Sequence, residues 1–140
     1  MTDAFQLQRY IDAQDPVFEQ VKQELRRGRK TGHWMWFIFP QIKGLGSSAM
    51  AQHFALSGRE EARAYANHAI LGSRLSECTR LVISVEGRSI GQIFGYPDDL
   101  KFRSSMTLFA EAAGENAVFA DALDKYFAGA PDPLTQAALT

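Results

Sequence analysis

The densest set of side chains able to do chemistry lies between Asp98 and Thr107. The segment holds two acids, two bases and three hydroxyls at an expected helix start: Asp98, Asp99, Lys101, Arg103, Ser104, Ser105 and Thr107. With Asp98 as the helix cap, Lys101 and Ser105 are about one helical turn apart and share a face. Asp98 or Asp99 could orient water or stabilise an oxocarbenium-like centre, and Lys101 could hold phosphates together with Arg103. Capping and exposed ion pairs are the alternative account of the acids and bases.

A second candidate segment runs from His33 to Gln41. Its sequence, His-Trp-Met-Trp-Phe-Ile-Phe-Pro-Gln, places two tryptophans between hydrogen-bonding groups. Trp34 or Trp36 could therefore stack on a base, with Gln41 beside it. His33 is a candidate catalytic residue together with Asp98 and Asp99. The alternative is that the aromatic side chains are core residues, and this is our interpretation of the two phenylalanines, because large apolar residues are usually buried.

The segment Gly44-Leu-Gly-Ser-Ser48 follows and leads into an expected short helix. The amides near Gly46 and Ser47 could cradle a phosphate, and Lys101 could contact the same ligand if the two segments meet. A tight turn capped by serine has the same composition, so a purely structural role is the alternative. We predict that His33, a tryptophan, Lys101 and Ser104 or Ser105 line one pocket.

Other residue types indicate neither a metal site nor a cofactor. The three histidines, at positions 33, 53 and 68, share no helical spacing, and there is one cysteine. Cys78 shares a helical face with Leu75 and Val82, so we expect a buried structural thiol. Four cations, Arg26, Arg27, Arg29 and Lys30, end an expected helix; they form either a solvated terminus or a small anion site.

The elements that would position these residues are mostly helical. One helix is expected from the Asp15-Pro16 cap to Gly28, and another from about Leu100 to Ala113 with Phe102, Met106 and Phe109 on one face. The run Trp34 to Phe39 lacks helical periodicity and is expected to be a short buried strand or an extended segment. Further helices are expected after Ser47 or Ser48, from Ser57 to Tyr65, after Gly72, from Ser89 to Phe94, around Val118, Ala122 and Tyr126, and after Asp132-Pro133.

The bulk properties are those of one folded domain spanning residues 1–140. The chain is 46% hydrophobic and 22% charged, which favours a compact, mainly α fold that leaves room for a minor strand element. Its net charge of −1 gives no global attraction for nucleic acid or an anionic membrane, and no apolar run is long enough to span a bilayer. A single cysteine and an N-terminus without signal-peptide character favour the cytoplasm. The oligomeric state is left open.

Several stretches resemble a bacterial family catalogued as domain of unknown function 1810, some members of which carry the label calpastatin. The resemblance covers about Phe5 to Leu139 and rests on His33 to Gln41, Gly44 to Met50, Phe94-Gly95, Asp98 to Lys101, Arg103 to Phe109, Leu7 to Tyr10 and Leu123 to Phe127. It implies a mainly helical fold and no established reaction. The calpastatin label does not fit this composition, because calpain inhibitors are disordered repeats.

A looser similarity is to the NADAR-type N-glycosidases that act on ADP-ribose conjugates. It lies in the order of an aromatic segment with Trp and His, then helices, then an acid-to-lysine segment before a helix ending in Phe. The tryptophans, the glycine loop and the cluster from Asp98 to Ser105 together motivate our leading hypothesis, a small hydrolase acting on a nucleotide or ADP-ribose-type ligand. The alternatives are a non-catalytic ligand-binding module and a protein-interaction module whose aromatic residues are only core.

Overall fold

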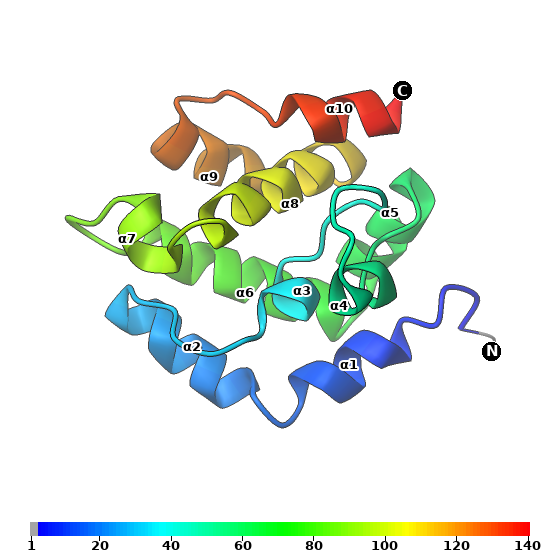
Figure 1. Cartoon of the computed structure of the whole chain (residues 1–140), viewed down its shortest axis with the longest axis horizontal. Coiled ribbons are helices and arrows are strands. Elements are labelled where there is room, and N and C mark those ends of the chain that lie inside the picture. Colours follow the sequence, from blue (N-terminus) through cyan, green and yellow to red (C-terminus); the bar gives the residue numbers. More distant parts are fainter. Residues whose placement is uncertain (1–2) are drawn as a thin grey trace.

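The structure is a computed structural model that describes residues 3–140 (Figure 1). In this range the chain folds into ten α-helices joined by short connections, so the prediction of a mainly α fold is confirmed. They are α1 (Gln8–Gln14), α2 (Phe18–Arg27), α3 (Met35–Ile38), α4 (Ala49–His53), α5 (Arg59–Asn67), α6 (Leu71–Ile83), α7 (Ile90–Phe94), α8 (Asp98–Ala112), α9 (Val118–Phe127) and α10 (Pro133–Leu139).

Helix α8 is the centre of the fold. It packs against α5, α7, α9 and α10, and Figure 1 shows it running between α1 and α2 on one side and α9 and α10 on the other. The expected stripe of Phe102, Met106 and Phe109 is fully buried. The intervening residues 104–108 are buried as well, so α8 is covered on most of its circumference rather than on one face.

Three of the predicted helix caps are confirmed. The Ser48 hydroxyl accepts a hydrogen bond from the Ala51 amide, and Ser89 forms a reciprocal capping box with Gln92. Asp132 caps α10 by accepting from the Thr135 amide. Each of these side chains satisfies a backbone N–H that has no acceptor inside its own helix, which is why serine and aspartate favour this position.

Two predicted caps are wrong. Helix α1 is not predicted from the sequence, and Asp15 ends it with helical backbone angles. The residue at the cap position of α2 is Val17. The Asp15 carboxylate instead accepts from Arg74 at 2.8 Å. Asp98 lies inside the first turn of α8, and Pro97 occupies the cap position. The carboxylates at both positions are used for ion pairs with distant cations.

The aromatic segment is helical rather than extended, so the expected strand is wrong here. Residues 35–38 form the single turn α3, and Met35, Phe37 and Ile38 are buried in it. Its helical state comes from burial against the rest of the core, which overrides the strand preference of aromatic residues. The strand-like pairing in the described range is one parallel bridge between Ile42 and Leu56.

Cys78 is fully buried on α6, as predicted. Burial raises the pKa of its thiol to about 12, and the charge of Glu77 acts in the same direction. We expect the native thiol to react with a maleimide at least about 100-fold more slowly than in urea-unfolded chain, because the reactive thiolate is scarce and inaccessible. Labelling followed by mass spectrometry measures both rates. Equal rates would contradict a structural role.

No helix in residues 3–140 is both long and apolar enough to cross a membrane.

Candidate ligand cavity

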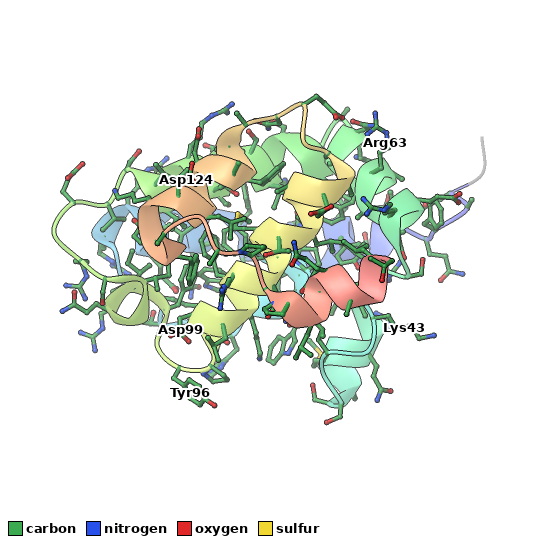
Figure 2. All side chains as sticks on the ribbon, turned by 90° about the horizontal axis from the view of Figure 1, so that it is seen from above. Lys43, Arg63, Tyr96, Asp99 and Asp124 are labelled. Atoms are coloured by element: carbon green, nitrogen blue, oxygen red, sulfur yellow. The ribbon has the colours of Figure 1, made fainter. Side chains whose placement is uncertain are left out.

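An open cavity of about 600 Å³ lies between α8, the start of α10 and the loop that precedes α4. Figure 2 shows α10 lying across α8, with α4 beside them. The cavity is lined by Gln41, Leu45, Gly46, Ser47, Ser48, Ala51, Pro97, Leu100, Lys101, Arg103, Ser104, Asp132 and Leu134. Four apolar side chains and one proline therefore line the cavity together with polar groups, a mixture typical of small-molecule sites.

The cavity brings the Asp98 to Thr107 segment together with the Gly44 to Ser48 loop and with Gln41, the last residue of the aromatic segment. Six of the nine predicted ligand-binding residues line it: Gln41, Gly46, Ser47, Lys101, Arg103 and Ser104. The loop side is held in place by the bridge, in which the Lys43 amide donates to Leu56 and the Leu56 amide donates to Gln41. The helix side is fixed by burial of α8.

Lys101 is the cation most available in this cavity. Its ammonium lies 3.6 Å from a carboxylate oxygen of Asp98 and 5.6 Å from the centre of the Trp36 ring. The other oxygen of Asp98 is only 2.8 Å from the Lys30 ammonium. One carboxylate is thus shared by two lysines, and the pair with Lys30 is the closer one. A positive charge remains at Lys101 for an anion.

Arg103 lines the cavity but is largely committed to the protein. Its Nε donates to the Ala130 carbonyl and its Nη2 to the Pro131 carbonyl, both at 3.0 Å. The guanidinium also lies over the Phe127 ring. These contacts fasten the connection between α9 and α10 to α8, so the predicted phosphate-binding role of Arg103 is limited to the N–H groups that remain.

Asp132 was not among the residues expected at a site, although it lines the cavity. One oxygen of its carboxylate accepts from the Ser104 hydroxyl at 3.2 Å and from the hydroxyl and amide of Thr135 at 2.6 and 3.0 Å. The Asp132 amide donates to Thr107. The Asp-Pro pair indicated only a cap, and no local pattern places α10 against α8.

The three predicted catalytic residues do not line this cavity. His33 is exposed, and Asp98 is held between the two lysines. Asp99 accepts a hydrogen bond from the Leu100 amide at the start of α8. Figure 2 shows Asp99 on the same side of the molecule as Tyr96. Catalytic roles for these side chains stay predictions.

Two predicted ligand-binding residues are buried in the core, and this corrects the expectation that they contact a ligand. Trp34 is 2% exposed and Ser105 is fully covered, and neither lines the cavity. The Ser105 hydroxyl has no hydrogen-bond partner among the described residues. Trp36 is half-buried and also lies outside the lining, so it contributes only through its contact with Lys101. The predicted common pocket therefore includes Lys101 and Ser104 but neither the histidine nor a tryptophan.

Glu24 explains why Trp34 is buried. One oxygen of its carboxylate accepts from the Thr31 and Gly32 amides and from the Trp34 indole at 2.7, 2.9 and 3.0 Å. Gln20 donates to the other oxygen. Burial alone would raise the pKa of Glu24, but the N–H donors, first the Gly32 and Thr31 amides and then the two side chains, lower it to about 2. No local sequence pattern indicates this buried charge.

Comparison with known proteins gives the same fold and a family without an assigned function. The chain is 56% identical to the conserved hypothetical protein Rv1873 from Mycobacterium tuberculosis, whose crystal structure superposes with a TM-score of 0.97 over 98% of each chain. A search of curated proteins finds no match. The family described as "Protein of unknown function (DUF1810)" matches residues 4–139. The resemblance seen in the sequence is confirmed, and the chain belongs to the DUF1810 family.

Proposed function

We propose that this protein is a non-catalytic module that binds a small anionic molecule with an apolar or ring-shaped part, of the nucleotide or ADP-ribose class. The observation that carries the proposal is the cavity of about 600 Å³ that joins Lys101 to apolar walls. The charge would meet the anionic group, and Leu45, Leu100 and Leu134 would cover the apolar part. Leu100 and Leu134 are 48% and 68% exposed, so they have contact area to offer.

The loop opposite Lys101 supports an anion in the same place. The backbone N–H groups of Gly46 and Ser47 donate no hydrogen bond within residues 3–140. Both residues line the cavity, as does Gln41 with its side-chain amide. A ligand between the loop and Lys101 would therefore find an ammonium on one side and hydrogen-bond donors on the other.

Binding is better supported than hydrolysis. Glycoside hydrolysis uses carboxyl groups placed on both sides of the scissile bond. Asp132 is the one carboxylate lining the cavity in the described range, and it is occupied by its own helix start and by Ser104. Asp98 is neutralised by lysines. The groups present suit holding a ligand more than activating water.

We expect Lys101→Met to weaken binding of ADP-ribose or AMP by about 1–3 kcal/mol, which is roughly 5- to 150-fold in affinity. The substitution keeps most of the apolar stem and removes the charge. Calorimetric titration of wild type and variant measures the effect. Lys43→Met is the matched control, because Lys43 is exposed, does not line the cavity and lies at the edge of the molecule in Figure 2.

Each outcome of the titration separates the hypotheses. Equal affinities of wild type and Lys101→Met would remove Lys101 from the site. Absence of binding to all variants would favour a protein-interaction module, for which the 83% exposed Tyr96 is a ready contact residue. Ligand recovered intact after long incubation with wild type is expected for a binding module. Release of free ribose-phosphate products would instead support the hydrolase.

A further inference from the structure

We propose that a second site, the arginine hollow, binds a compact polyphosphate such as pyrophosphate or the polyphosphate group of a small molecule. This open hollow of about 390 Å³ is lined by Arg27, Arg29, Thr31 and Arg88. It lies where the end of α2 meets the segment before α7, which are neighbours in Figure 1. None of its lining residues lines the ligand cavity.

The arginine hollow is assembled by the turn that ends α2. Gly28 has a φ of +73°, a left-handed conformation that turns the chain out of the helix. A Cβ at this position would lie 2.9 Å from Val85 and 3.0 Å from Arg88, so glycine also permits close packing. The Lys30 amide then donates to the Ile93 carbonyl and fixes the turn against α7.

Arg88 is held in place by this packing. Its Nε donates to the Gly28 carbonyl at 2.9 Å and its Nη2 to the Gln92 carbonyl at 3.2 Å. A guanidinium has five N–H groups, so others remain for a ligand. The contact brings Arg88 to Arg27 and Arg29 although about 60 residues separate them in the chain.

Glu24 holds the loop that carries Thr31, one of the residues lining the arginine hollow. The Thr31 amide and the Gly32 amide both donate to this buried carboxylate. These two hydrogen bonds fix the backbone of the loop that carries the Thr31 side chain. The negative charge of Glu24 is satisfied by N–H donors and lines no part of the hollow. The site therefore combines a fixed loop with arginines that face solvent.

The charge of the arginine hollow is uncompensated within the described range. Arg27, Arg29 and Arg88 are exposed and form no salt bridge there, and the lining contains no acid. The three positive charges repel each other, and a multivalent anion bound between them is attracted to each one. This attraction outweighs the repulsion among the arginines. Arginine binds phosphate oxygens with paired N–H groups, and the Thr31 hydroxyl adds a further donor.

The walls decide the class of ligand. The lining has no aromatic or large apolar side chain that could grip a base or a lipid chain. Three guanidiniums and a hydroxyl match closely spaced phosphate oxygens instead. A compact polyphosphate uses all of them at once, whereas inorganic phosphate can engage only part of the set, so pyrophosphate is expected to bind at least several-fold more tightly than phosphate.

The test is calorimetric titration of the full chain with pyrophosphate and with inorganic phosphate at low salt. We expect the double variant Arg27→Gln/Arg29→Gln to bind pyrophosphate roughly tenfold or more weakly than wild type. Neither side chain makes a hydrogen bond or salt bridge within residues 3–140, so the fold is expected to persist, and circular dichroism checks it.

The control Arg59→Gln/Arg80→Gln removes the same two charges elsewhere on the surface and is expected to keep the wild-type affinity for pyrophosphate. Lys101→Met is expected to keep it as well, which separates this site from the ligand cavity. Equal loss in both double variants would mean that pyrophosphate senses only net charge, and would overturn the proposal. Tighter binding of a short single-stranded RNA, lost in the same Arg27/Arg29 variant, would overturn the assignment to a small molecule.

Discussion

Glu24→Ala is expected to lower the free energy of unfolding by about 3–5 kcal/mol at neutral pH, a loss typical of breaking a buried hydrogen-bonded network. The substitution removes the common acceptor of two backbone amides, the Trp34 indole and the Gln20 side chain. The Trp34 indole is buried and would then lack a partner, and the part-buried amides of Thr31 and Gly32 would lose their acceptor. Urea unfolding followed by tryptophan fluorescence measures the change.

The same carboxylate makes stability depend on acid pH. The folded pKa of Glu24 is about 2, below its usual value of 4.5, so the unfolded chain takes up a proton first as the pH falls. The stabilisation is therefore complete above about pH 4.5 and is lost as the pH falls toward about 2. A pKa difference of this size corresponds to about 3 kcal/mol. Glu24→Ala is expected to lack this part of the acid sensitivity.

Glu19→Ala is the matched control for Glu24. It removes a carboxylate from the same helix, but the Glu19 side chain is 77% exposed and its ion pair is with the neighbouring Lys22. We expect a change below about 1 kcal/mol, because exposed ion pairs contribute little. Equal destabilisation by the two substitutions, or an unchanged acid dependence in Glu24→Ala, would contradict the role assigned to the buried carboxylate.

Gly72→Ala is expected to destabilise the fold by about 2–4 kcal/mol, because a tightly packed backbone has to move. A Cβ at Gly72 would lie 2.0 Å from the carbonyl oxygen of Ala66, at the point where α5 passes α6. Alanine favours a helix interior over glycine by about 1 kcal/mol, so the clash outweighs a local gain. Differential scanning calorimetry of the variant measures the loss.

Gly58→Ala is the control for this second prediction. Gly58 precedes α5 with extended backbone angles, and a Cβ there would meet no atom within 4 Å. Its substitution is expected to change stability by less than about 1 kcal/mol. A neutral Gly72→Ala variant would show that α5 and α6 separate easily, contrary to the close approach of Gly72 to the Ala66 carbonyl.

The helices were predictable where their ends are determined by neighbouring residues. Ser48, Ser89 and Asp132 cap the helices that their side-chain chemistry indicates. Asp15 and Asp98 have the same chemistry but pair with cations far along the chain. A short polar side chain can satisfy either a local amide or a distant charge, and the sequence shows only the local option.

The site was predictable only in part, because several of its contacts join residues that are far apart in the chain. The predicted anion site requires the loop at Gly46 to lie near Lys101, and both residues line the cavity. Trp34 was expected to contact a ligand but is buried, because its indole donates to Glu24, an acid ten residues earlier in the chain. Glu24 also accepts from two backbone amides and from Gln20. Arg88 joins the arginine hollow through a contact with Gly28. Contacts of this kind arise from tertiary packing and leave no periodic pattern in the chain.

The bridge between Ile42 and Leu56 has a consequence for how the cavity accommodates ligands. It closes a loop that includes α4, a helix without a buried residue, whereas Phe54 directly after α4 is buried against Tyr10 and Phe37. Little apolar area therefore holds residues 43–53 to the core. Local unfolding of such a segment costs far less free energy than global unfolding. We therefore expect residues 43–53 to open as a unit while α8 and the buried Phe54 remain in place. Measured affinities would then include the free energy of ordering this unit, and ligands of different size could share one cavity.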